Sequence, residues 1–323
     1  MPVTITAGIT FSGGGLTMAF GPPAAPTAGW FSAGMVSGSV TTVSRITFAT
    51  DTDTASIRGP LSAARKYHAA TGNFTYGYHG GGQYPGASPG GYSTSVDRIT
   101  YTTDTATSTT RGPLDATRYQ SAATSSDSYG YFGAGYDING NKQASICRID
   151  YSNDTATAST RGPLPLAIYK PAASSDTTTY GWFGGGSVFP TNPRPISSVS
   201  RITYANDTTT ATARGPLASA RYQVVATGNS SYGWYAGGDT YSTVDRITYA
   251  NDTATATARG PLSRSVYSFA GAGDNNYGWF AGGKPGPKST VDRIDYANDT
   301  AIAGVRGPLA AATYAFAASS GVQ

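Results

Sequence analysis

Residues that could do nucleophilic, acid–base or metal chemistry are few in this sequence. It has one cysteine, Cys147, and two histidines, His68 and His79, and it has no glutamate. A single cysteine can form neither an internal disulfide nor a cysteine-based zinc site. We interpret Cys147 as a buried apolar filler. The sequence therefore predicts no catalytic centre, no metal site and no cofactor.

Twelve of the 22 lysines and arginines recur at two fixed positions of a repeat. Six strand arginines are each followed 13 residues later by the arginine of an Arg-Gly-Pro motif. The strand arginines are Arg45, Arg98, Arg148, Arg201, Arg246 and Arg293; the motif arginines are Arg58, Arg111, Arg161, Arg214, Arg259 and Arg306. Between them lie the turn aspartates Asp51, Asp104, Asp154, Asp207, Asp252 and Asp299.

These repeated charges are more simply structural than catalytic. A catalytic group is needed once in a molecule, whereas a structural group in a repeat is needed in every copy. We therefore expect the arginines and aspartates to form hydrogen bonds and ion pairs of the scaffold. An alternative for the motif arginines is a ring of six guanidinium groups that faces an anionic ligand.

The elements that position these residues are short strands. The chain has 42 glycines and 23 tyrosines in 323 residues, and only 12% of its residues are charged. Glycine and β-branched threonine disfavour helices, while threonine and tyrosine favour strands. Each repeat divides into four strands, a to d, separated by turn residues, as in residues 232–262. Six such repeats predict an all-β, six-bladed β-propeller of four-stranded blades.

The two ends of the chain predict how the ring closes. The first repeat begins at its strand b near Gly29 and has no strand a of its own, while the sequence after Arg306 continues as a strand a. We expect residues near 312–320 to pair with residues 29–34. This pairing would complete the first blade and remove exposed sheet edges.

One loop per repeat varies in length. The stretch between the glycine doublet and the strand arginine holds 10, 15, 12, 14, 7 and 9 residues in the six copies. Loops carry function on a constant scaffold, and tyrosine beside glycine, serine and asparagine is typical of adaptable recognition surfaces. The candidate ligand-binding residues of these b–c loops are Tyr84, Tyr92, Tyr136, Phe189 and Tyr241. Their aromatic faces would also suit sugars.

We divide the chain into residues 1–27, an arm with a Pro/Ala linker, and residues 28–323, the propeller. Alternating strand directions place the b–c loops and the d–a crossings on one face, and the arm is expected to leave from the opposite face. Alternation in the arm predicts a short β segment that pairs with something outside the propeller. We expect the arm to bind other structural proteins of an assembly.

Charge and hydropathy argue against two classes of partner, nucleic acid and the membrane interior. The net charge is +4, but the cations are spread over the repeats and not clustered, so nucleic acid is not expected. The N-terminal segment lacks the pattern of a secretory signal, and no apolar run approaches about 18 residues, so membrane insertion is not expected either. A homo-oligomer is compatible with the sequence.

The glycine doublet after an aromatic strand, the period of roughly 50 residues and the six copies resemble the kelch superfamily of propellers over about residues 28–323. The paired Tyr and Trp spacing of typical kelch repeats is not reproduced. The repeat motifs RIDYANDTA and RGPL are similar to sequences of virion structural or tail-associated proteins of marine bacteriophages, especially those infecting cyanobacteria. That resemblance implies a place in a virion; the alternative location is extracellular or at a cell surface.

Enzymes on propellers depend on groups that this chain lacks. Copper oxidases among kelch-like propellers need a cysteine beside two histidines, and sialidase-like sites need a glutamate and an arginine triad. His68 and His79 could be neighbours and form a weak metal site. We expect a structural or binding protein, not an enzyme, whose variable loops contact host glycans or neighbouring subunits. The alternative is a carbohydrate-active enzyme or secreted lectin that uses the loop face and aspartates.

Overall fold

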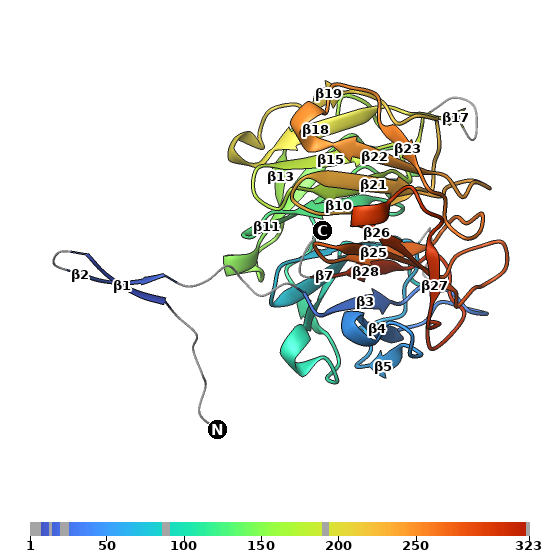
Figure 1. The fold of residues 1–323 in the computed structure, drawn as a ribbon, viewed down its shortest axis with the longest axis horizontal. Coiled ribbons are helices and arrows are strands. Elements are labelled where there is room, and N and C mark those ends of the chain that lie inside the picture. Colours follow the sequence, from blue (N-terminus) through green and yellow to red (C-terminus); the bar gives the residue numbers. More distant parts are fainter. Residues whose placement is uncertain (1–7, 13–14, 20–25, 86–90, 189–193, 321–323) are drawn as a thin grey trace.

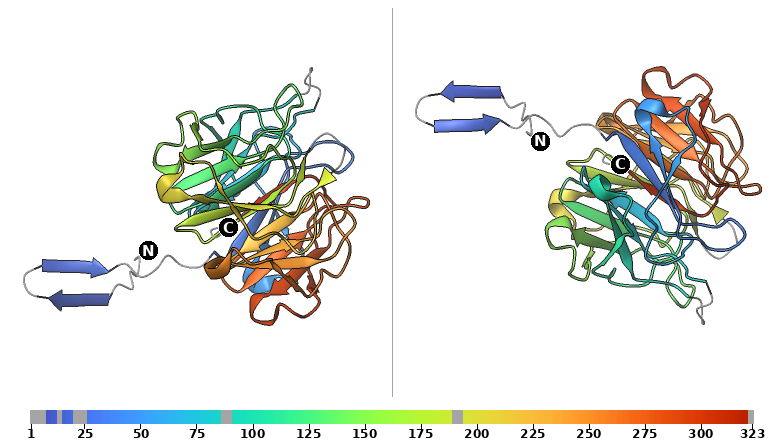
Figure 2. Two further views of the ribbon diagram at one scale, coloured as in Figure 1. Left: turned by 90° about the horizontal axis from the view of Figure 1, so that it is seen from above. Right: turned by 90° about the horizontal axis from the view of Figure 1, so that it is seen from below.

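The computed structural model describes residues 8–12, 15–19, 26–85, 91–188 and 194–320. Six antiparallel sheets of four strands form a six-bladed β-propeller, as predicted (Figures 1 and 2). Each innermost strand contacts the innermost strand of the next sheet, and the contact from β28 to β6 closes the circle. None of the described helices is long and apolar enough to cross a membrane.

The strands are short, as propeller blades require. From the axis outwards, blade 1 holds β28 (Ala317–Ser319), β3 (Ala28–Ser32), β4 (Val43–Thr47) and β5 (Ser56–Arg58). Blade 2 holds β6 (Ala69–Gly72), β7 (Tyr76–Gly80), β8 (Val96–Thr100) and β9 (Thr109–Arg111). Blade 3 holds β10 (Ala122–Ser125), β11 (Tyr129–Gly133), β12 (Ile146–Asp150) and β13 (Ser159–Arg161).

The remaining blades repeat the same order. Blade 4 holds β14 (Ala172–Ser175), β15 (Tyr180–Gly184), β18 (Val199–Thr203) and β19 (Thr212–Arg214). Blade 5 holds β20 (Val225–Gly228), β21 (Tyr232–Ala236), β22 (Val244–Thr248) and β23 (Thr257–Arg259). Blade 6 holds β24 (Ala270–Gly273), β25 (Tyr277–Ala281), β26 (Val291–Asp295) and β27 (Gly304–Arg306).

Closure follows the predicted pairing of the chain ends. Strand β28 runs antiparallel to β3, with Ala317 opposite Ser32, Ala318 opposite Phe31 and Ser319 opposite Trp30. The C-terminal strand thus supplies the missing inner strand of blade 1. We call the junction of blade 6 with blade 1 the seam.

Turns between strands c and d differ in detail from the expected Asn/Asp turn. The residue after strand c begins a short 3₁₀ helix, and the turn aspartate follows that helix. These helices are η1 (Phe48–Thr50), η2 (Tyr101–Thr103), η3 (Tyr151–Asn153), η4 (Tyr204–Asn206), η5 (Tyr249–Asn251) and η6 (Tyr296–Asn298). Their first residue is aromatic because its ring packs on the neighbouring blade.

An interblade latch made of one aspartate, one hydrogen-bonding aromatic side chain and two arginines joins each pair of blades. Between blades 1 and 2, Trp30 Nε1 and Arg45 Nη1 lie 2.8 and 3.1 Å from Asp104 Oδ2, and Arg58 Nε lies 3.5 Å from the same oxygen. Tyr101 stacks on Trp30 with ring centroids 3.9 Å apart. Equivalent latches are centred on Asp154, Asp207, Asp252, Asp299 and, at the seam, Asp51. The motif arginines are therefore scaffold residues that pair with carboxylates.

The glycine of the Arg-Gly-Pro motif completes this contact. Gly59 N–H donates to the carbonyl of Asp104 at 2.8 Å, and a Cβ at Gly59 would lie 1.9 Å from the carbonyl oxygen of Ala106. No side chain fits at such a distance, so the backbones of neighbouring blades can approach only where the residue is glycine. All six motif glycines make the equivalent hydrogen bond.

The two faces of the propeller differ. Isolated bridges join the d–a crossings to the b–c loops, as between Lys66 and Gln83, and this side is called the loop face. The a–b turns and the 3₁₀ helices form the opposite turn face. Phe48 N–H donates to the carbonyl of Thr27, so the chain enters the propeller beside the turn at η1.

Two further hairpins lie outside the blades. In the arm, β1 (Gly8–Ser12) pairs with β2 (Gly15–Ala19), so the β structure expected there pairs within the arm itself. In the b–c loop of blade 4, β16 (Ser187–Val188) pairs with β17 (Arg194–Pro195). The sequence did not predict this second hairpin.

Candidate functional site

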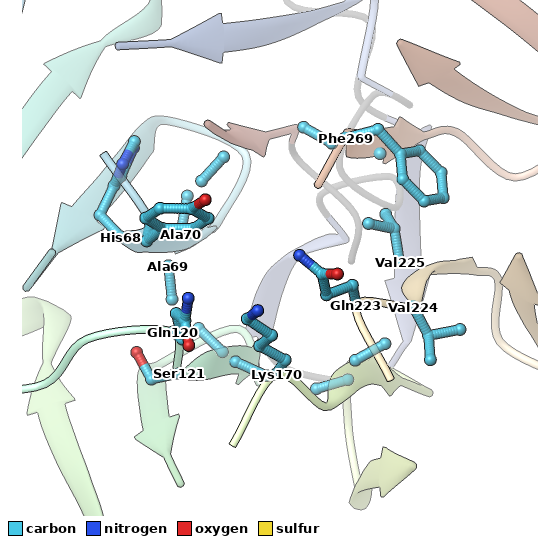
Figure 3. Close-up of a pocket in the computed structure, with 18 of the residues that line it drawn as sticks. His68, Ala69, Ala70, Gln120, Ser121, Lys170, Gln223, Val224, Val225 and Phe269 are labelled. Atoms are coloured by element: carbon cyan, nitrogen blue, oxygen red, sulfur yellow. The ribbon is translucent and has the colours of Figure 1, made fainter. Parts of the chain in front are cut away.

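One cavity among the described residues lies at the loop-face end of the central channel. The first residues of all six innermost strands line it, and alanines such as Ala69, Ala122 and Ala172 form much of the wall. Its volume is about 140 Å³. Six inner strands crowd the axis, so their side chains are small, and these small side chains leave the cavity open. Figure 3 shows 18 of the residues that line it.

A ring of backbone hydrogen bonds shapes the mouth of this channel. One residue per blade, just before the inner strand, has a positive φ between 53° and 59°: Tyr67, Gln120, Lys170, Gln223, Ser268 and Ala315. The Gln120 N–H donates to the Tyr67 carbonyl, and the Lys170 N–H donates to the Gln120 carbonyl, both at 2.9 Å. Equivalent bonds join Gln223 to Lys170, Ala315 to Ser268 and Tyr67 to Ala315. The left-handed backbone turns five of these carbonyls toward the next blade, those of Tyr67, Gln120, Lys170, Ser268 and Ala315.

A tyrosine collar surrounds the mouth. It consists of Tyr67, Tyr92, Tyr119, Tyr136, Tyr169, Tyr222, Tyr267 and Tyr314. All but Tyr169 are partly exposed. Tyr119 stacks on Tyr92 at 4.9 Å, meets the edge of Tyr67 at 5.2 Å and lies 6.2 Å from Tyr136 between ring centroids. Burial together with neighbouring tyrosines raises the pKa of Tyr119, so its hydroxyl group stays neutral. The collar offers ring faces and hydroxyl groups to a ligand.

Lys170 places a cation beside the channel. Its ammonium lies 5.6 Å from the ring centre of Tyr169 and 5.2 Å from that of Tyr222. Burial lowers the pKa of Lys170 to about 8, although the charge of Asp239 opposes this shift. Gln120 and Gln223, from the blades on either side, lie next to Lys170 (Figure 3).

The loop residues expected to bind a ligand lie in different places. Tyr92 and Tyr136 belong to the collar. Tyr84 turns inward, with its hydroxyl bonded to Ser95 and 3.3 Å from Nη2 of buried Arg65. Tyr241 is 50% exposed on the loop face. Phe189 lies outside the described residues.

His68 and His79 are neighbours, as the sequence suggested. Ser32 Oγ lies 3.1 Å from His68 Nε2 and 2.7 Å from His79 Nδ1, and His79 Nε2 lies 3.2 Å from Ser319 Oγ. Burial lowers the pKa of His68, and it lowers that of His79 to about 3. The pair is therefore neutral and links blade 2 to the inner strands of blade 1. No group of three or more His, Cys, Asp or Glu side chains that could hold a metal occurs among the described residues.

A second set of buried ion pairs supports the d–a crossings. Arg65 pairs with Asp97 at 3.0 Å and Arg221 with Asp245 at 2.7 Å, and the side chains of these pairs are at most 2% exposed. In blade 3 the equivalent of Asp97 is Cys147, and Arg118 instead pairs with Asp115 at 3.0 Å. Cys147 is fully buried, and burial raises the pKa of its thiol to about 11.

Sequence reasoning missed most of the collar and Lys170. The signal was present: in five of six repeats a tyrosine directly precedes the left-handed residue at the channel mouth, at Tyr119, Tyr169, Tyr222, Tyr267 and Tyr314. The next residue, by contrast, differs between most blades. A variable position beside a fixed aromatic one, close to the axis, is what a ligand site on a repeat scaffold needs.

No protein-family model matches the chain, and no curated protein matches it. Solved structures that resemble it number 456 chains. One of them, described as "Structure of YjhT", has a TM-score of 0.67 and 12% sequence identity, over 86% of this chain and 97% of that chain. At this identity the likeness shows the propeller fold alone.

Proposed function

We propose that this chain is a non-enzymatic binding protein whose loop face recognises glycans. The tyrosine collar carries the proposal: Tyr67 lines the cavity, and in each of the other five blades a tyrosine directly precedes a residue that lines it. Binding sites for small ligands are concave, rich in aromatic groups and supplied with a few polar groups. A sugar ring presents an apolar face and a rim of hydroxyl groups, and the collar supplies partners for both.

The contrast between the interblade latches and the channel mouth supports a protein that presents a variable binding surface on a constant scaffold. Repeated ion pairs, stacked rings and glycines occupy the interblade latches, while side chains around the channel mouth differ from blade to blade. Variation on a constant scaffold is typical of recognition surfaces. The repeats resemble the kelch superfamily and virion-associated phage proteins, and we propose that residues 1–27 attach the propeller to a virus particle.

A glycan array tests recognition. We expect the full chain to bind a restricted set of glycans, and both Tyr119→Ala and Tyr222→Ala to weaken binding at least tenfold. Phe74→Ala is the matched control, because Phe74 is a 36% exposed aromatic residue beside the a–b turn of blade 2, on the turn face. Absence of binding to every glycan, or equal binding by the collar variants, would refute the proposal. Turnover in a hydrolase panel would point to the enzyme alternative.

Deletion of residues 1–27 tests attachment. The truncated chain keeps all six blades, so we expect it to fold with an unchanged thermal midpoint and yet fail to enter particles. Normal incorporation of this truncated chain would show that the arm is not the anchor.

A further inference from the structure

We propose that the channel mouth binds the anionic group of an acidic sugar, a carboxylate or a sulfate ester, with Lys170 as its counter-ion. The inference rests on the proposed glycan binding and specifies its ligand class.

The wall of the cavity is rich in donors. None of the described residues that line it is an aspartate, and the sequence has no glutamate. Lys170 supplies an ammonium group, Gln120 an amide and Ser121 a hydroxyl group, while the Gln223 amide donates to Ser268 Oγ at 2.5 Å. His68 also lines the cavity but is held neutral by burial. An incoming anion would therefore meet one cation and several neutral donors, which is the usual composition of a charge-assisted site.

Lys170 is only partly compensated within the described chain. Two ring faces, of Tyr169 and Tyr222, lie against its ammonium, and Asp239 acts on it electrostatically. Asp239 does not line the cavity and is itself affected by burial, which raises the pKa of its carboxyl group. A ligand anion inside the cavity would stabilise the ammonium from the side that the protein leaves uncharged.

Size limits the ligand to one sugar unit. A cavity of about 150 Å³ holds a single six-membered carbon ring, and this one has a volume of about 140 Å³. The charged substituent and part of one ring can enter, while neighbouring sugar units would lie on the collar outside. We therefore expect recognition of a terminal or branch residue that carries the negative charge.

Calorimetric titration with monosaccharides tests the site directly. The probes are glucuronate, which carries a carboxylate, glucose 6-sulfate, which carries a sulfate ester, and neutral glucose. The proteins are the full chain, Lys170→Gln, Lys170→Arg and Lys284→Gln. Lys284 is the matched control, because its ammonium also lies over a collar tyrosine, 4.3 Å from the ring centre of Tyr314, but does not line the cavity. Glutamine already occupies the equivalent left-handed position in two other blades, at Gln120 and Gln223, so the Lys170→Gln backbone is unstrained.

We expect at least one of the two anions to bind at least tenfold more tightly than glucose at pH 7, and the stronger of the two identifies the group. This preference should vanish in Lys170→Gln and persist in Lys284→Gln. Because the anion binds the protonated amine, affinity should fall about tenfold per pH unit above 8. Lys170→Arg should bind without that fall, since guanidinium stays charged.

Each failure has a separate meaning. Equal binding of acid and neutral sugars, or a preference that survives Lys170→Gln, overturns the anion site. If the glycan array still shows collar-dependent binding of neutral glycans, the proposed function stands without this site. If the array is negative while the acidic monosaccharides bind through Lys170, the anion site stands and the glycan-recognition proposal fails.

Discussion

Trp279 lies flat on Phe48 across the seam, with ring centroids 3.9 Å apart and an angle of 4° between the rings. The two residues are far apart in the chain, yet their stack resembles the one between Trp30 of blade 1 and Tyr101 of blade 2, whose ring centroids are also 3.9 Å apart. The seam is therefore closed by the same latch as the other interfaces.

Loss of the charge on Asp51 should weaken the seam. Asp51 accepts from Trp279 at 2.8 Å and pairs with Arg293 and Arg306 at 2.9 and 3.2 Å. Asp51→Asn keeps an acceptor for Trp279 but leaves two guanidinium groups without their carboxylate. We expect the free energy of unfolding to fall by about 3 kcal/mol. Urea unfolding measures this; Asp53→Asn, at an exposed neighbour, should be neutral. Equal midpoints for the two variants would contradict the latch.

A methyl group at Gly260 should force blades 5 and 6 apart. Its Cβ would lie 1.9 Å from the carbonyl oxygen of Ala301, which belongs to the backbone and cannot rotate away. We expect Gly260→Ala to destabilise the protein by about 2 kcal/mol or more. Gly38→Ala is the control, because nothing lies within 4 Å of its added Cβ. A thermal midpoint unchanged in Gly260→Ala would show that the blades can shift freely.

Acid should destabilise the junction of blades 1 and 2 through His79. The pKa of His79 is lowered by burial to about 3, against an ordinary value of 6.5, so below pH 6.5 the unfolded chain binds a proton that the folded chain does not. Stability should therefore fall as the pH drops from 6.5 toward 3, by about 2 kcal/mol at pH 5. His79→Asn should show a smaller loss between pH 7 and pH 5 in urea titrations. The same pH slope in both proteins would contradict this origin.

Buried Arg118 should accept its carboxylate partner from position 147, where other blades have it, in place of Asp115. Asp115→Ala removes the carboxylate that accepts from buried Arg118, and we expect a loss of about 3 kcal/mol. Adding Cys147→Asp to this variant places a carboxylate at the blade 3 position equivalent to Asp97, which pairs with Arg65 in blade 2. The double variant should recover most of the lost stability. A double-mutant cycle measured by urea unfolding checks the rescue. Additive losses would show that the two positions do not share Arg118.

The sequence predicts the blades and their closure because both follow from spacing along the chain. The constant 13-residue separation of the arginines and the missing first strand near Gly29 were sufficient. The partner of each arginine was not predictable in the same way. Arg45 pairs with Asp104 of the next blade, not with Asp51 of its own, because the carboxylate lies at the interface between sheets. Spacing along the chain does not show which carboxylate lies nearest to each arginine in space.

The candidate site was predictable in part. Length variation pointed to the b–c loops, and Tyr92 and Tyr136 from these loops contact Tyr119 of the collar. The tyrosines before the inner strands were overlooked because repetition made them look like scaffold residues. Lys170 follows one of these tyrosines at a position that varies between blades, but spacing along the chain does not place it near the axis, between Gln120 and Gln223.

The ring of hydrogen bonds at the channel mouth has a consequence for the evolution of this protein. The bonds at Tyr67, Gln120, Lys170, Gln223 and Ala315 join backbone groups, so they do not depend on the identity of the side chains. Tyrosine, glutamine, lysine, serine and alanine all occupy this ring with nearly the same φ. Selection can therefore exchange what points into the channel one blade at a time without loosening the mouth. A library randomised at the six left-handed positions, Tyr67, Gln120, Lys170, Gln223, Ser268 and Ala315, would therefore vary the wall of the channel on an unchanged backbone.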